Sequence, residues 1–206
     1  MIASMKPPYV ITQTILKLIT SISEKIGEVN ANYLNKQSPT LRKQNKIKTI
    51  HSSLQIEGNT LSQEQITALI ENKRVIGPEK DVTEVLNAIK VYENLESFKA
   101  TDEKSFLNAH QIMMKGLIAN PGKYRNKSVG IVKGLEVAHV APPFENVPFL
   151  MKDLFTYLKK SDEIVLIKSC VFHYEMEFIH PFLDGNGRIG RLWQTIILME
   201  KYPVFE

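Results

Sequence analysis

Hydrophobic positions recur at helical spacing over most of this chain. Residues 11–33 carry a one-sided apolar stripe, and a second pattern begins at Pro39 and ends at Gly58, a residue type typical of helix ends. Ser62 and Gln65 have the spacing of a capping box, which predicts the start of a short helix. These patterns predict a mainly helical protein. Further helical patterns cover residues 82–98, 106–117, 148–158, 164–179 and 188–201.

The pattern of polar and apolar residues changes between positions 122 and 143. Ser128 to Ile131 alternate, Lys133 and Gly134 can form a turn, and Val137 to Val140 follow as a second short run. This pattern predicts a short β-hairpin or extended flap, at about residues 127–141, within a helical protein.

The stretch from Ile164 to Ile179 is apolar nearly all round, which predicts a helix at the centre of a bundle. It contains Cys170, the single cysteine, which cannot form a disulfide within the chain and is expected to be buried. His110 and Trp193 also fall among apolar helix positions. We interpret both as core residues, with His110 hydrogen-bonded there.

Composition and charge narrow the classes of function. The 206 residues are 43% hydrophobic and carry a formal net charge of +4, which excludes a disordered chain and suits one folded unit. The charge is too small for a dedicated nucleic-acid binder, so nucleic acid is not an expected partner. A basic run flanking Pro39 is interpreted as a solvated helix face. It consists of Lys36, Arg42, Lys43, Lys46 and Lys48.

The expected location is the cytoplasm. No apolar run approaches the ~20 residues of a membrane span, since Lys168 and Lys201 interrupt the longest ones. The N-terminus lacks the compact apolar segment of a secretory signal. A chain with one cysteine also suits a reducing compartment, and no membrane partner is expected.

The most informative stretch joins the last two helical patterns, from His180 to Arg191, and reads His-Pro-Phe-Leu-Asp-Gly-Asn-Gly-Arg-Ile-Gly-Arg. Pro181 prevents simple continuation of the preceding helix, and three glycines within six residues permit unusual backbone conformations. Because the loop then opens a helix, it presents unpaired N–H groups and a positive dipole end. The loop is therefore a candidate anion-binding cradle.

The charged side chains of this stretch suit a polyphosphate. Arg188 and Arg191 lie three residues apart, so both can reach one polyphosphate from the same side of a helix. Asp184, the only carboxylate of the loop, can hold a divalent cation that bridges phosphates, and His180 can accept a proton near neutral pH. Each feature alone is usually structural, but their combination within twelve residues favours a functional site.

Residues 180–191 resemble the signature of the Fic family, His-Pro-Phe-x-Asp/Glu-Gly-Asn-Gly-Arg-x-x-Arg, at every defined position. The resemblance implies the all-α Fic fold, a helical bundle with a short β-hairpin flap beside the active-site loop. It also implies nucleotidyl transfer, most often of AMP from ATP to a Ser, Thr or Tyr hydroxyl of a protein, with release of pyrophosphate. ATP and a protein target are then the expected partners, and self-modification and a homodimer are compatible with this function.

The resemblance also implies a role for each residue of the motif. His180 would deprotonate the target hydroxyl for attack on the α-phosphorus. Asp184 would hold Mg²⁺ or Mn²⁺ on the α- and β-phosphates of ATP. The nucleotide-binding residues would be Gly185, Asn186 and Gly187 at the transferring phosphorus, and Arg188 and Arg191 at the β- and γ-phosphates.

The hairpin would bind the target in this family. Backbone pairing with an extended target segment would place the hydroxyl in line without reading much of the target's sequence. Phe182 is expected to point into the core and anchor the active-site loop. The expected target-binding residues are Ser128, Val129, Gly130, Ile131, Val137, Ala138, His139 and Val140.

A second motif, Ser53-x-x-x-Glu57-Gly58, lies far upstream. Alone it is a weak signal, because a glutamate at a helix end is usually solvated. In a chain that resembles the Fic family, it resembles the inhibitory motif Ser/Thr-x-x-x-Glu-Gly/Asn of members with an N-terminal inhibitory helix, the class II-like arrangement. Glu57 would pair with Arg191 and remove the partner of the γ-phosphate, and Ser53 would hold the inhibitory helix in place.

The expected organisation is an N-terminal helical region, residues 1–100, with the inhibitory helix from Ser53 to Gly58, and a catalytic core, residues 101–206, in one compact unit. Two alternatives to AMP transfer stay open. The same residues could remove AMP from a modified protein by hydrolysis, with Glu57 positioning the water, or the chain could be a nucleotide-sensing module without catalysis, against which the intact His180 argues. A kinase-like relative is disfavoured because that branch carries Lys in place of Gly187.

Overall fold

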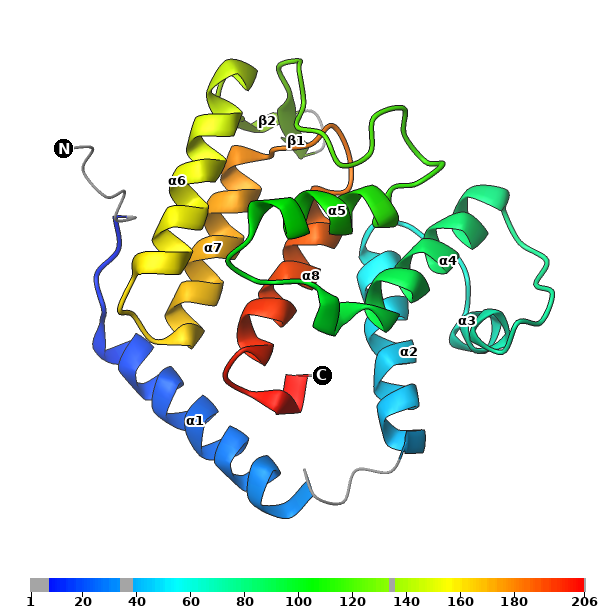
Figure 1. Ribbon diagram of the computed structural model, residues 1–206, viewed down its shortest axis with the longest axis horizontal. Helices are drawn as coiled ribbons and strands as arrows, with labels where there is room; N and C mark the ends of the chain where they lie inside the picture. The colour runs from blue at the N-terminus through cyan, green and yellow to red at the C-terminus, as the bar shows by residue number, and fades with distance from the viewer. Residues whose placement is uncertain (1–7, 34–38, 134–135, 206) are drawn as a thin grey trace.

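The computed structural model describes residues 8–33, 39–133 and 136–205 (Figure 1). Helices make up most of these segments, as the hydrophobic pattern predicted. The α-helices are α1 (Gln13–Tyr33), α2 (Pro39–Ile56), α3 (Gln63–Ile70), α4 (Glu79–Glu93), α5 (Glu103–Met113), α6 (Val147–Lys160), α7 (Val165–Ile179) and α8 (Asn186–Met199). The 3₁₀ helices are η1 (Leu95–Ser97), η2 (Phe144–Asn146) and η3 (Pro203–Phe205), and the strands are β1 (Gly130–Lys133) and β2 (Glu136–Val140).

Local sequence signals define the helix ends that lead to the site. Pro39 is the first residue of α2, a position where its missing N–H would have no helical partner. After α2, Gly58 adopts a left-handed φ of +90°, which turns the chain away from the helix axis. The Oγ of Ser62 accepts from the N–H of Gln65, whose side chain accepts from the N–H of Ser62. The capping box predicted for α3 is therefore confirmed.

One hydrophobic core joins the helices from α2 to α8. α8 runs beside α7, while α5 and α6 pack around this pair (Figure 1). Aromatic rings fill the centre, with Phe106 packed edge-on against Trp193 at 5.1 Å between ring centroids. Trp193 is fully buried, as predicted, and its indole N–H donates to the carbonyl of Ala100 at 3.0 Å. The junction between α7 and α8 is therefore built on the packed core.

The surroundings of α7 differ from the prediction. Phe172 and Met176 are fully buried, but Tyr174 and Phe178 are 67% and 43% exposed, and Cys170 is exposed as well. The prediction that Cys170 is buried in a central helix is wrong. A helix that is apolar on all sides gives no periodic signal for the face that its neighbours cover, so the sequence did not show that one face of α7 stays open.

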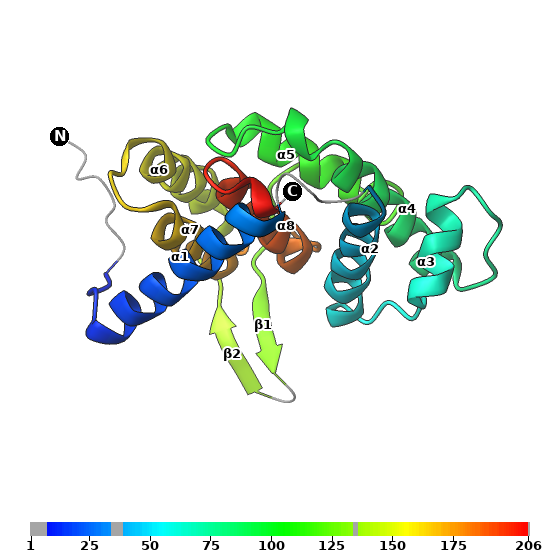
Figure 2. The same ribbon diagram turned by 90° about the horizontal axis from the view of Figure 1, so that it is seen from below.

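The strands β1 and β2 pair antiparallel and project from the helical body (Figure 2). Gly130 stands opposite Val140 in this register. The N–H of Ala141 donates to the carbonyl of Val129 at 3.3 Å and joins the two ends of the hairpin next to the helices. Gly134, predicted to turn the chain, and the side chains of residues 131–139 lie outside what the structure describes.

α1 lies along one side of the molecule and contacts η3 (Figure 2). Its apolar stripe is only partly covered, because Ile26 is buried whereas Leu18 and Ile22 are exposed. Among the described residues, no helix combines the length and the apolar character needed to cross a membrane.

Candidate active site

The stretch from His180 onward forms the loop between α7 and α8. His180 ends α7 in a left-handed conformation, with φ 50° and ψ 61°, and Pro181 cannot continue the helix. Gly185 is also left-handed, with φ 85°, directly before the first residue of α8. A Cβ on Gly185 would lie 2.7 Å from the Sδ of Met114, so both the conformation and the space require glycine. The N–H groups of the first turn of α8 thus open into the loop, as an anion-binding cradle requires.

The side chain of Asn186 ties the loop to itself. Its Oδ1 accepts from the N–H of Phe182 and its Nδ2 donates to the carbonyl of Phe182, both at 2.9 Å. Both residues are buried, and Phe182 anchors the loop in the core as predicted. The side chain of Asn186 is already hydrogen-bonded within the loop. The phosphate contact that the sequence predicted for Asn186 would therefore be made by its backbone N–H at the start of α8.

His110 supports the loop from α5. Its ring stacks on Phe182, with 3.5 Å between centroids and 6° between planes. Its Nδ1 accepts from the N–H of Gly122 at 2.9 Å and its Nε2 donates to the carbonyl of Asp184 at 3.0 Å, which assigns the proton to Nε2. Burial lowers the pKa of His110 to about 4, although the Asp184 carbonyl acts in the opposite direction. His110 is the hydrogen-bonded core residue that was predicted, and it also binds the backbone of Asp184.

Asp184 presents its carboxylate at the open side of the loop. The side chain is 51% exposed, and its Oδ1 accepts from the N–H of Gly185 at 2.6 Å and from the Nη2 of Arg188 at 2.9 Å. Among the described residues, no group of three His, Cys, Asp or Glu side chains could hold a metal by itself. One exposed carboxylate is still a suitable donor for Mg²⁺, which usually keeps several waters and binds through one or two carboxylates and substrate phosphates. The residues present therefore fit a metal that arrives with phosphates.

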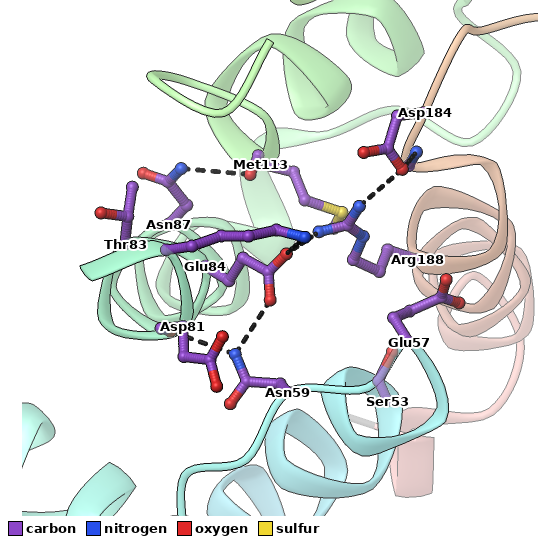
Figure 3. A network of polar contacts seen from close by, with 12 residues as sticks. Ser53, Glu57, Asn59, Asp81, Thr83, Glu84, Asn87, Met113, Asp184 and Arg188 are labelled. Atoms are coloured by element: carbon purple, nitrogen blue, oxygen red, sulfur yellow. Dashed lines mark hydrogen bonds and ion pairs between the residues drawn. The ribbon is translucent and has the colours of Figure 1, made fainter. Parts of the chain in front are cut away.

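Arg188 is held by a carboxylate that the sequence did not indicate. Its Nη1 donates to the Oε1 of Glu84 on α4 at 2.9 Å, and both side chains are 4% exposed. The second oxygen of Glu84 accepts from the Nδ2 of Asn59 at 2.9 Å, and Asn59 also donates to the carbonyl of Asp81 (Figure 3). This buried network joins the segment after α2, helix α4 and the start of α8.

Arg191 is held by the end of α2. Its Nη2 donates to the Oε1 of Glu57 at 2.6 Å, with the two side chains 26% and 29% exposed. Its Nε donates to the Oγ of Ser53 at 3.0 Å, and Nη2 also reaches the carbonyl of Ser53 at 2.9 Å. The upstream motif thus contacts the second arginine of the loop directly.

The carboxylate of Glu57 also covers the first turn of α8. A Cβ on Gly187 would lie 2.5 Å from the Oε1 of Glu57. The absence of a side chain at Gly187 therefore leaves room for the Glu57 carboxylate. A second carboxylate, that of Glu177 on α7, lies against Gly190. A Cβ on Gly190 would be 2.5 Å from the Oε1 of Glu177. Burial raises the pKa of Glu177, His173 and Arg191 lower it, and Glu57 acts in the same direction as burial. The carboxylate of Glu57 thus binds Arg191 where the phosphate was predicted, and the charge of Arg191 also acts on Glu177.

The structure gathers the residues of both sequence motifs at the start of α8. The hairpin joins them through Arg125, which donates to the carbonyls of His180 and Pro142. Sequence reasoning assigned no role to Arg125, Glu84 or Asn59. Only Asn59 stood beside a motif, directly after Gly58.

Residues 100–198 match the model of the Fic/DOC family. Residues 100–198 are a Fic/DOC family domain. Its curated relatives include a probable protein adenylyltransferase of Aquifex aeolicus and the protein adenylyltransferase Fic of Nematostella vectensis, each 30% identical, over 133 and 164 residues. The matches cover 59% and 73% of this chain but 41% and 36% of the relatives. The Fic chain thus spans less than half the length of these two relatives.

Solved structures confirm the Fic fold. A crystal structure of a Fic family protein from Desulfovibrio desulfuricans matches with a TM-score of 0.93 at 47% identity, over 98% of this chain and 62% of that chain. Fic-1 of Caenorhabditis elegans matches with a TM-score of 0.72 at 23% identity, over 90% of this chain and 60% of that chain, and shares the fold.

Proposed function

We propose that this Fic chain transfers AMP from ATP to a hydroxyl group of a protein, with release of pyrophosphate. The observation that carries the proposal is the loop between α7 and α8, in which a proton acceptor, His180, precedes a glycine-lined helix start that is followed by two arginines. The names of the relatives, protein adenylyltransferases, support the same class of reaction for this chain.

The residues of the loop suit this chemistry. The N–H groups at the start of α8 and the helix dipole favour the phosphates of ATP. His180 would accept the proton of the target hydroxyl while that oxygen bonds to the α-phosphorus, and the bond from the α-phosphorus to the leaving pyrophosphate breaks. Arg188 and Arg191 would neutralise the charge on the leaving group. Such transfers depend mainly on positioning and charge neutralisation, so a few fixed groups are sufficient.

Asp184 would hold a Mg²⁺ ion that enters with ATP, since its carboxylate is exposed at the loop. When bound, the ion would supply further charge neutralisation at the phosphates. Asp184 also accepts from Gly185 and Arg188, so it would order the cradle as well as bind the metal.

Glu57 would restrain the reaction, as expected of a class II-like Fic protein. Its carboxylate pairs with Arg191 and lies against Gly187, so it takes the place that a phosphate would need at both residues. The pair is partly exposed, so it can open at a lower cost than a buried pair. Helix α2 would thus act as an internal inhibitor of the site.

The test is transfer of labelled AMP from ATP to proteins of a cell lysate by the Glu57→Gly variant, with mass spectrometry of the products. Adding His180→Ala should leave ATP binding intact and reduce labelling at least about 100-fold, the range of a lost general base. Equal labelling by the alanine variant would contradict the role of His180. Release of AMP from labelled proteins without transfer from ATP would instead assign hydrolysis, and ATP binding without either reaction would assign nucleotide sensing.

A further inference from the structure

Arg125 lies between α7, the active-site loop and the hairpin, and it is 3% exposed. The N–H of its backbone donates to the carbonyl of Pro181 at 2.8 Å. Its guanidinium donates to backbone carbonyls: Nε to His180 at 2.8 Å, Nη1 to Lys127 at 2.9 Å, and Nη2 to Pro142 at 2.5 Å and to Ile179 at 3.3 Å. One residue therefore contacts the end of α7 and both ends of the hairpin.

At the end of α7, these bonds stabilise a backbone that is otherwise unfavourable. His180 adopts a φ of +50°, which residues with a Cβ rarely do. The last carbonyls of a helix have no partner within the helix, and a cation is favoured beside them. Arg125 bonds three successive carbonyls, those of Ile179, His180 and Pro181. The turn that carries the His180 side chain is therefore fixed by Arg125.

At the hairpin, Arg125 bonds Lys127, which precedes β1, and Pro142, which follows β2. The guanidinium is a rigid planar fork, so its N–H groups keep fixed directions relative to one another. The position of His180 and the positions of both hairpin ends are thus linked through one rigid group.

We propose that Arg125 is a positioning residue for AMP transfer: it sets the distance and angle between His180 and the hairpin, and through them the approach of the target hydroxyl to the base. This inference rests on the function proposed above. Lysine cannot replace it, because a single ammonium nitrogen cannot span the carbonyls on both sides. None of the contacts of Arg125 described here involves the arginines or the first turn of α8, so ATP binding should not depend on it.

The experiment compares Arg125→Lys with its parent, both in the Glu57→Gly background. A misplacement on the order of 1 Å between base and hydroxyl can cost about 100-fold in rate, so we expect kcat for target labelling to fall at least about tenfold while the Kd for ATP stays within about twofold. The matched control is Arg74→Lys, an exposed arginine between α3 and α4, which should change neither quantity. Arg125→Gln, which lacks the charge, should behave like Arg125→Lys.

Hydrogen exchange gives a second measurement that does not depend on activity. In Arg125→Lys, backbone amides of residues 127–130, 140–141, 179–180 and 182–185 should exchange faster, while those of α4 should not change. If the Glu57→Gly parent labels no protein, the function proposed above is wrong. Hydrogen exchange does not depend on labelling, so unchanged exchange in Arg125→Lys would overturn the role of Arg125 in that case too. Labelling equal to the parent, a parallel loss of kcat and ATP binding, or failure of both variants to fold would also overturn it.

Discussion

Glu84 and Glu57 each hold one arginine of the active-site loop, but in different surroundings. The pair of Glu84 and Arg188 is 4% exposed on both sides, and breaking a buried pair leaves a charge without a partner or water. The pair of Glu57 and Arg191 is 29% and 26% exposed, so water can replace either partner. We therefore expect Arg188 to stay bound to Glu84 during the reaction, whereas Arg191 exchanges Glu57 for a phosphate.

His110 should make the stability of the protein depend on pH. Its pKa falls from 6.5 to about 4 on folding because the ring is buried. Between these values the unfolded chain binds a proton that the folded protein does not, so the free energy of unfolding decreases as pH falls from about 6.5 to about 4. The loss should be on the order of 3 kcal/mol at the lower end.

Urea denaturation at a series of pH values measures this dependence. His110→Gln keeps a side-chain donor for the carbonyl of Asp184 but does not titrate, so its free energy of unfolding should change less over the same pH range. The same pH slope in both proteins would show that His110 is not responsible.

From the residues alone, site residues could be predicted only where they lie close together in the sequence, and the distant pair of Glu57 and Arg191 was predicted from the family resemblance. His180, Asp184 and the two arginines lie within twelve positions, so their chemistry can be read as one motif. Arg188 and Glu84 are 104 positions apart, and only the packing of α4 against the site brings them within 2.9 Å. No spacing in the sequence indicates such a partner.

At the level of helices, the end of α2 contacts α8 through Ser53 as well as through Glu57. The Oγ of Ser53 accepts from the Nε of Arg191 at 3.0 Å, one turn before Glu57 on the same side of α2. A single hydrogen bond of this kind contributes about 0.5–1.5 kcal/mol, so Ser53→Ala should release Arg191 in part and raise AMP labelling roughly 2- to 10-fold. Initial rates of target labelling, measured with wild-type protein alongside, would show the increase.

Ser52→Ala is the matched control for Ser53→Ala, since Ser52 is the exposed neighbour of Ser53 on α2. It should label at the wild-type rate. If Ser53→Ala and Ser52→Ala gave the same rate, the hydrogen bond between Ser53 and Arg191 would have no inhibitory role.

Helix ends were predictable, whereas the surroundings of α7 were not. The capping box at Ser62 and the glycine at position 58 act within a few residues of chain, so their effect can be read locally. The exposed face of α7, with Cys170, depends on which neighbours pack against it. An evenly apolar helix carries no information about that choice.

At the scale of the whole molecule, the segment from Ser53 to Asn59 is connected to the two arginines of α8 by two routes. Glu57 contacts Arg191 directly, and Asn59 reaches Arg188 through Glu84. The hydrophobic core also includes residues on both sides of position 100, such as Leu54 and Trp193. We propose that residues 1–100 and 101–206 work as one unit, in which Glu84 of α4 fixes Arg188 and the end of α2 withholds Arg191 from phosphate.

The central claim is that this site transfers AMP once Arg191 is free of Glu57. Glu57→Gly removes a charge-assisted hydrogen bond of about 1.5–3 kcal/mol, which corresponds to a roughly 10- to 100-fold increase in the occupancy of Arg191 by phosphate. Gln55→Gly, at an exposed position in the last turn of α2, two residues before Glu57, controls for the effect of a new glycine in this region.

The decisive measurement is the initial rate of AMP incorporation from ATP, by mass spectrometry, for wild type, Glu57→Gly and Gln55→Gly at equal concentrations of folded protein. We expect Glu57→Gly to exceed the other two by at least about tenfold. A Glu57→Gly protein that is folded and binds ATP, but labels no faster than Gln55→Gly, would contradict the account.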